Sequence, residues 1–172
     1  MEIVPSTKLM LLNLERIDKY IHLANIKASL VLPANAILLG FLLDNKETYL
    51  KILEDTSLSW FTLISYVAVL FSIVISILFS IFVVIAYLKS DSKSGDYYSL
   101  LYFGSIGEME LNTFLKKISE ITEESFIDDL GRQIYLLSKE LKKKFCRVNW
   151  SLSFLSFSFI LSIVTIILGV IL

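Results

Sequence analysis

The basic residue at the start of the first apolar segment is the first candidate for chemistry. Lys27 stands directly before the uncharged run 28–43, with Asn25 beside it and His22 about one helical turn earlier. An ammonium group at such a boundary marks the topology by reaching toward the lipid headgroups, or it binds an anionic ligand at the mouth of the span. The sequence leaves both interpretations open.

A second group of cations, Arg132, Lys139 and Lys143, recurs on one face of a predicted helix. Most charged faces of this kind are solvated and do nothing further. The alternative is a phosphate contact, because the arginine guanidinium offers a fork of donors that fits phosphate oxygens. The sequence therefore indicates a basic face that serves either solvation or anion binding.

Hydroxyl side chains share a face in each of the two later apolar segments. They are Ser65, Ser72, Ser76 and Ser80 in one segment, and Ser151, Ser158, Ser162 and Thr165, joined by Gly169, in the other. Small residues let helices pack closely, and hydroxyls bond to a neighbouring helix or to their own backbone. The alternative is a polar lining for a pore formed by several subunits. Neither segment contains an ionisable residue, so we expect no proton relay or voltage sensor.

The sequence offers little material for catalysis. With one histidine, His22, and one cysteine, Cys146, a single chain has no His/Cys metal cluster and no internal disulfide. The glycines form neither a phosphate-binding loop nor a dinucleotide motif. A net charge of -1 gives no general attraction to nucleic acid. We therefore expect a protein that is not an enzyme and that carries no cofactor.

Three apolar segments must position these candidates in a chain that is 55% hydrophobic. A membrane span needs roughly 20 apolar residues. The segment 28–43 is short, contains Pro33 and Asn35, and must borrow from residues 20–27. The segments 60–88 and 148–172 are long enough. The start of the chain lacks the features of a cleaved secretory signal, so the first segment is expected to remain. The sequence predicts an all-α integral membrane protein with three transmembrane helices.

Lysine and arginine predict the orientation, because they resist translocation. They gather before the first segment and between residues 89 and 147, whereas the loop between the first two segments is rich in acidic residues. The N-terminus and residues 89–147 are therefore predicted to be cytoplasmic. The predicted divisions are an interfacial helix at 1–27, two spans with a short external loop at 28–88, a cytoplasmic helical domain at 89–147, and a third span at 148–172.

The predicted cytoplasmic domain contains two helical patterns. In the first, apolar residues recur at helical spacing from Leu111 to Ile121. Residues 122–125 are expected to form a turn, with Ser125 as a candidate cap for a helix that starts near Phe126 and continues into the third span. Its apolar stripe has a period of about 3.5 residues, which favours helix–helix packing. That packing forms either a hairpin within one subunit or a seam between subunits.

Three sequence strings together resemble the Pycsar effector family PycTM. The segment 20–29 (YIHLANIKAS) is similar to the opening of that family, in which Ala-Asp-X-Lys-Ala is common and an aspartate is usual at the position of Asn25. The strings LYFGSI at 101–106 and DLGRQIYLLS at 129–138 resemble its aromatic-glycine motif and its last cytoplasmic helix. The resemblance covers roughly residues 9–172.

The resemblance implies an antiphage effector of the bacterial inner membrane. In such systems a separate cyclase makes cyclic CMP or cyclic UMP, and the effector impairs the membrane, which leads to abortive infection. We hypothesise that the nucleotide binds among Asn25, Lys27, Tyr102, Arg132 and Lys139, and that binding reorders a homo-oligomer and opens a path along the serine faces. The alternatives are a membrane scaffold that docks a cytoplasmic partner, and a toxin that damages membranes constitutively.

Overall fold

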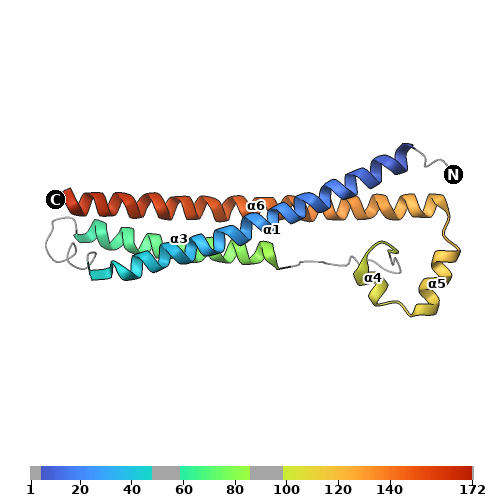
Figure 1. Ribbon diagram of the computed structural model, residues 1–172, viewed down its shortest axis with the longest axis horizontal. Coiled ribbons are helices and arrows are strands. Elements are labelled where there is room, and N and C mark those ends of the chain that lie inside the picture. Colours follow the sequence, from blue (N-terminus) through green and yellow to red (C-terminus); the bar gives the residue numbers. More distant parts are fainter. Residues whose placement is uncertain (1–4, 48–58, 86–98, 172) are drawn as a thin grey trace. The chain divides into compact units, whose positions relative to one another are not determined.

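The computed structural model describes residues 5–47, 59–85 and 99–171, and the regular structure in these ranges is helical (Figure 1). The helices are α1 (Pro5–Asp44), α3 (Ser59–Val84), α4 (Phe103–Gly107), α5 (Leu111–Ser119) and α6 (Glu123–Ile171). Three of them, α1, α3 and α6, are long and apolar enough to cross a membrane. The predicted all-α class with three span-capable helices is therefore confirmed.

Helix α1 runs through the whole first apolar segment without a break. It has 40 residues and contains Pro33 in its interior. The segment predicted to be helical before Lys27 and the predicted first span are consecutive parts of this one helix. Pro33 has no N–H to donate to the carbonyl of Ser29, one turn earlier, and membrane helices tolerate such a loss. Two residues after the proline, the Asn35 side chain donates to the carbonyl of Val31 at 3.0 Å.

Helix α6 has 49 residues and includes the whole predicted third span as far as Ile171, as expected. The prediction for its start was wrong, because the helix begins at Glu123 and Ser125 lies inside it. The capping residue is Thr122, whose Oγ1 accepts from the Ser125 N–H at 3.2 Å while Ser125 Oγ accepts from the Thr122 N–H at 3.1 Å. This reciprocal pair satisfies amide groups that lack partners within the helix. A serine in the place of the usual Glu or Gln hid the motif.

The internal contacts divide the chain into two units. One unit, here called the bundle, comprises Leu23–Ile85 and Lys144–Leu172. The other, here called the α4–α5 unit, comprises Met1–His22 and Ala86–Lys143. Helices α1 and α6 each contribute to both. The assignment of predicted divisions to the cytoplasm and to the membrane stays a prediction.

Two apolar clusters stabilise the bundle. The buried members of the alanine cluster are Ala24, Ala28, Val83 and Val148, and those of the leucine cluster are Leu38, Leu42, Val69 and Ile73. Residue numbers rise along α1 and fall along α3 from the first cluster to the second, so the two helices are antiparallel. Bonds from α3 to α6 show the same reversal. Helices α1 and α6 therefore run in the same direction within the bundle.

The α4–α5 unit has a smaller buried core. Leu130 is fully buried, and Ile17 is nearly so. Several polar side chains accompany them in the interior, namely Thr7, Ser99, Ser105, Asp129 and Gln133. Helix α5 buries no residue completely, and its apolar stripe is largely exposed, with Leu111 70% and Leu115 53% accessible.

Candidate functional site: a polar layer and a carboxylate-anchored turn

Four polar side chains form a layer across all three helices of the bundle. The Asn35 amide of α1 donates to Ser76 Oγ of α3 at 2.9 Å. The Ser76 hydroxyl donates to the carbonyl of Ser151 on α6 at 2.8 Å, and the Ser151 hydroxyl donates back to the Ser76 carbonyl at 2.7 Å. Ser80 Oγ lies 2.7 Å from Ser151 Oγ. We call these four residues the polar layer.

The polar layer is sealed from solvent. Asn35, Ser76, Ser80 and Ser151 are each 0% exposed. Along α1 and α3, the layer falls between the alanine cluster and the leucine cluster. On α6, Ser151 lies between Val148 of the alanine cluster and Leu155, which packs against the leucine cluster, so apolar side chains close the layer at both ends. A serine has little bulk, and this allows the backbones of α3 and α6 to approach closely enough for hydroxyl-to-carbonyl bonds.

The remaining hydroxyls of the predicted serine faces are also buried in the single chain. Ser72 Oγ donates to the Phe154 carbonyl of α6 at 2.8 Å. Ser158 and Ser162 instead donate to carbonyls of their own helix. Farther along the bundle, Thr165 Oγ1 donates to Ser65 Oγ at 3.0 Å. These contacts are those expected of helix packing, and the lining of a pore by these residues stays a prediction.

Three of the four described Lys and Arg residues of the bundle, Lys27, Lys144 and Arg147, lie at one end of it, and Lys46 lies at the other. Lys144 Nζ donates to Asn25 Oδ1 at 2.9 Å, and Lys27 Nζ lies 5.8 Å from the centroid of the Phe145 ring, within reach of a cation–π contact. Arg147 makes a long contact of 3.5 Å to the Phe82 carbonyl, in the last turn of α3. A cation there complements the negative end of the helix dipole. We call Lys27, Lys144 and Arg147, together with Asn25, the basic rim.

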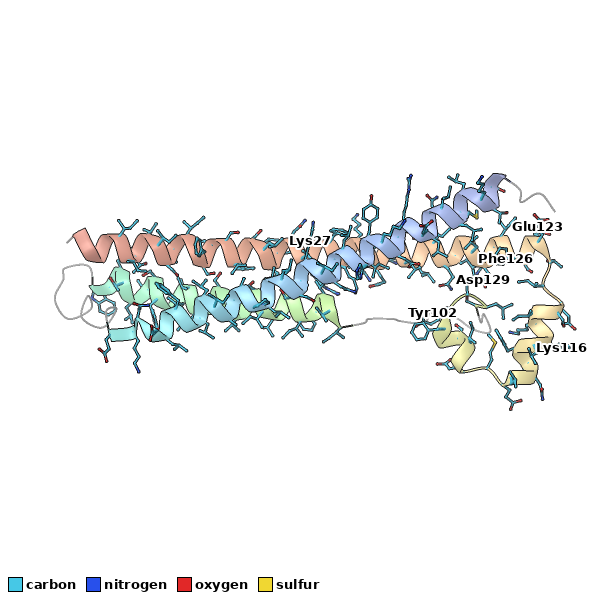
Figure 2. The ribbon with its side chains drawn as sticks, in the orientation of Figure 1. Lys27, Tyr102, Lys116, Glu123, Phe126 and Asp129 are labelled. Carbon is cyan, nitrogen blue, oxygen red and sulfur yellow. The ribbon has the colours of Figure 1, made fainter. Side chains whose placement is uncertain are left out.

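Tyr102 lies in the turn that precedes α4, within the α4–α5 unit (Figure 2). Ser99 Oγ holds this turn by accepting from the N–H groups of Leu101 at 3.1 Å and Tyr102 at 3.2 Å. The ring lies so close to Gly104 that a Cβ there would be 2.5 Å from one ring carbon. Burial, with a smaller effect of Glu108, raises the pKa of the Tyr102 phenol, which therefore stays neutral at physiological pH. A neutral phenol can stack and can donate a hydrogen bond.

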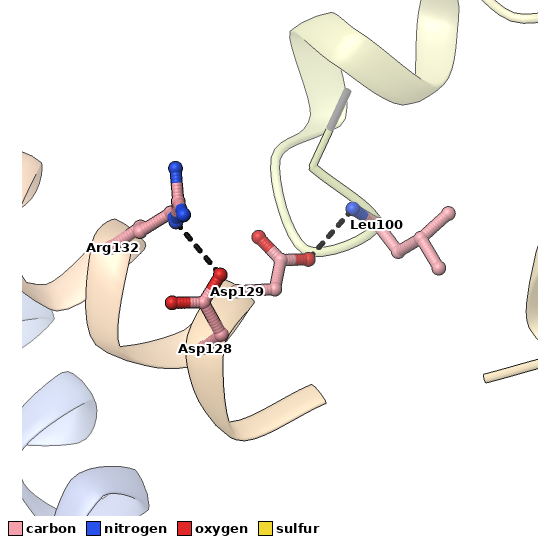
Figure 3. A network of polar contacts seen from close by, with 4 residues as sticks. All are labelled: Leu100, Asp128, Asp129 and Arg132. Atoms are coloured by element: carbon pink, nitrogen blue, oxygen red, sulfur yellow. Dashed lines mark hydrogen bonds and ion pairs between the residues drawn. The ribbon is translucent and has the colours of Figure 1, made fainter. Parts of the chain in front are cut away.

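Two neighbouring carboxylates of α6 have different surroundings (Figure 3). Asp129 is 6% exposed, and its Oδ2 accepts from the Leu100 N–H at 2.8 Å. Asp128 is exposed and accepts from Arg132 Nε at 2.8 Å across one helical turn. Asp129 therefore attaches the turn that carries Tyr102 to α6, while Asp128 orients the arginine next to it.

The five predicted ligand residues are divided between the two units. Asn25 and Lys27 belong to the bundle, whereas Tyr102, Arg132 and Lys139 belong to the α4–α5 unit. Lys139 is exposed on α6. In the described residues, no group of three His, Cys, Asp or Glu side chains is arranged to hold a metal ion.

Sequence reasoning missed Asp129 and underused Asn35. Asp129 directly precedes Leu130 of the apolar stripe, and so stands at the edge of the buried face. Asn35 was treated only as a polar interruption of a short span. The signal that could have found it is its type, because a primary amide in the middle of an apolar helix needs partners from neighbouring helices.

The comparisons with known proteins give one clear result. The family model of the Pycsar effector protein domain, PycTM, matches residues 9–171, which is nearly the whole chain. No curated protein and no solved structure gives a significant match.

Proposed function

Because this chain belongs to the Pycsar effector family PycTM, an antiphage defence family, we propose that it senses cyclic CMP or cyclic UMP and then impairs the bacterial inner membrane. Cell death or growth arrest before phage release would follow. The protein acts without catalysis, as a ligand-gated membrane effector. The family match carries this proposal, and the three span-capable helices support its membrane action.

The basic rim supports a cytoplasmic location for one end of the bundle. Lys27, Lys144 and Arg147 gather there, and positive residues mark the cytoplasmic side of bacterial membrane proteins. Because α1 and α6 run in parallel through the bundle, both spans start at this end. The N-terminus and residues 89–147 then lie in the cytoplasm, where a cyclic nucleotide is made.

The groups proposed to bind the nucleotide supply the chemistry that it needs. The phosphate is an anion, for which Arg132 and Lys139 of the α4–α5 unit are suitable partners, and Lys27 of the bundle offers a cation of the same kind. The pyrimidine is a planar ring that can stack on the neutral ring of Tyr102. Asp129 acts as a positioning residue, because it holds the Tyr102 turn on the helix that carries Arg132.

Continuity of α6 supports a link between binding and the membrane. The helix begins at its Thr122 cap and continues without a break to Ile171. A ligand shifts a protein toward the state that it binds more tightly. A shift of α6 that is favoured by nucleotide in the α4–α5 unit would therefore reach the serines of the polar layer along a single helix.

The proposal is tested by dye entry into cells that express the chain with a matched pyrimidine cyclase. We expect entry of an impermeant dye only when the cyclase is active, and loss of entry in Arg132→Glu and Lys27→Glu. Lys116→Glu is the matched control, because Lys116 is an exposed lysine of the α4–α5 unit that only approaches Glu120 at 4.0 Å. Dye exclusion with an active cyclase would contradict the proposal, and entry without any cyclase would indicate a constitutive toxin.

A direct measurement separates binding from its consequence. Purified full-length protein should bind cyclic CMP or cyclic UMP and should not bind cyclic AMP. Arg132→Glu should weaken that binding at least about tenfold, since it reverses a phosphate-binding charge. Absence of binding to either pyrimidine nucleotide would contradict direct sensing.

One observation favours a second candidate function. The stripe of α5 formed by Leu111, Leu115 and Ile118 is exposed, as a docking face for a protein partner would be. In that case the chain is a scaffold, and the serine faces contact only protein. Leu115→Asp then removes the antiphage activity, while cells that express the unchanged chain exclude the dye. Loss of dye entry in Arg132→Glu with full activity in Leu115→Asp supports the sensor instead.

A further inference from the structure

The polar layer contains one acceptor that no donor satisfies. Both N–H groups of the Asn35 amide are used, one by the Val31 carbonyl and one by Ser76 Oγ. The hydroxyls of Ser76 and Ser151 donate to each other's backbone carbonyls, which leaves the Ser80 hydroxyl to donate to Ser151 Oγ. Asn35 Oδ1 is fully buried and has no hydrogen-bond partner among the described residues. Every donor of the layer is therefore already engaged.

A buried carbonyl oxygen without a donor disfavours the arrangement that contains it. In a soluble protein, water often satisfies such a group. In a bilayer no water is available from the side, and here the alanine and leucine clusters close the layer along the bundle axis. The closed bundle thus keeps Asn35 Oδ1 away from water. This acceptor would gain a hydrogen bond from water if the helices separated.

We propose that Asn35 Oδ1 is a hydration site, at which a water molecule donates a hydrogen bond when α1 moves away from α3 and α6. This first water within the span would start the aqueous path by which the membrane is impaired, so the inference rests on the proposed function. Water fits better than a cation, because the layer contains no carboxylate to balance a charge at membrane depth. A second subunit cannot supply the donor in the closed state, because Asn35 is 0% exposed.

The first test asks whether water reaches the polar layer upon activation while Asn35 is still present. Ser80 is 0% exposed in the same layer. Ser80→Cys is made in a Cys146→Ser chain, which removes the exposed native thiol, and is treated with a membrane-impermeant thiosulfonate. We expect modification to be at least about tenfold faster in cells with the matched cyclase, since the thiolate that reacts requires water. Ile37→Cys is the control, because Ile37 is 74% exposed on the outer surface of α1 and should stay unreactive in lipid. Dye entry without faster modification of Ser80→Cys would overturn the inference.

The second test needs neither a nucleotide nor membrane damage. Asn35→Leu has the same number of side-chain heavy atoms, removes the unsatisfied oxygen, and leaves Ser76 bonded to Ser151. We expect the thermal unfolding midpoint of this purified variant to lie between the wild-type value and roughly 2 °C above it, whereas Ser76→Ala should lower the midpoint. A fall for Asn35→Leu as large as that for Ser76→Ala overturns the inference.

The two tests also separate the failure of the inference from the failure of the proposed function. If cells exclude the dye even with an active cyclase, the proposed membrane effect fails and the midpoint of Asn35→Leu still decides the hydration site. If cells admit the dye, Asn35→Leu should reduce entry, because the closed bundle no longer contains an acceptor that gains from water. Unchanged entry in that variant would contradict the inference.

Discussion

The bundle and the α4–α5 unit bury polar groups in different ways. In the bundle the buried polar groups are neutral hydroxyls and one amide, and those of the polar layer bond from helix to helix through Ser76 and Ser151. In the α4–α5 unit a carboxylate, Asp129, is buried and bonds to the backbone of a turn. Charged pairs such as Arg132 with Asp128 remain on the surface there.

This difference corresponds to the solvent expected around each unit. A charge is too costly within a bilayer, so neutral groups join the bundle helices, and small side chains provide close packing. In a unit that is surrounded by water, a carboxylate can be buried when a backbone N–H donates a hydrogen bond to it. The comparison indicates that the stability of the bundle depends on close packing of small side chains between its helices. The position of the turn that carries Tyr102 depends instead on one hydrogen bond to a charged group.

The largest expected effect comes from bulk in the polar layer. Ser151→Leu places a large side chain where the exposed fraction is 0%, and it should lower the free energy of unfolding by about 2–3 kcal/mol, because α3 and α6 must move apart. The effect is measured by thermal unfolding in detergent. Ser153→Leu is the control, since Ser153 is exposed and bonds only to its own helix at Asn149. Equal losses in both variants would show that close packing at Ser151 is unimportant.

An intermediate effect is expected at the buried carboxylate. Asp129→Ala leaves the Leu100 N–H without its acceptor and should cost about 1.5–3 kcal/mol locally. Faster amide hydrogen exchange at Leu100 and Tyr102 would report it. The neighbouring Asp128→Ala removes only an exposed ion pair and should cost less than about 0.5 kcal/mol. If the amide hydrogens of Leu100 and Tyr102 exchange at the same rate in both variants, Asp129 does not hold the turn.

The smallest expected effect concerns the position of one ring. In Gly104→Ala the new Cβ would lie 2.5 Å from the Tyr102 ring, so the ring must move, while helix propensity offsets the strain and stability changes by less than about 1 kcal/mol. Gly107→Ala is the control, because no atom lies within 4 Å of a Cβ at that position. Nucleotide affinity should fall in the first variant only. Equal affinity in both would remove Tyr102 from the proposed site.

The sequence predicts the helices of the bundle well, because a long uncharged segment in a bilayer has few alternatives to a helix. The segment 60–88 and α3 agree wherever the structure describes them, and the long last helix was expected. The first span-capable helix was expected, but the continuity of α1 from Pro5 to Asp44 was not predicted, because Pro33 and the charges before it interrupt the apolar pattern. The true start of α6 depended on a Thr122–Ser125 pair that differs from the usual capping pattern.

The candidate site was only partly predictable. The hydroxyl periodicity showed which serines share a face, but it could not show that Ser76 and Ser151 exchange bonds, because that depends on how two helices align. The burial of Asp129 depends on a turn that begins at Ser99, and no helical pattern describes that turn. The proposed nucleotide residues remain a prediction, since their arrangement around a ligand is a tertiary property.

The arrangement of small and large side chains around α6 has a geometric consequence. Successive residues of a helix are separated by about 100°. A turn of α6 about its own axis by one residue would replace Ser151 with Leu152, and Ser158 with Phe159, both of which now point away from the interior. Such a rotation would place a wide side of α6 where a narrow side now packs. The neighbouring helices would then have to separate to make room for it.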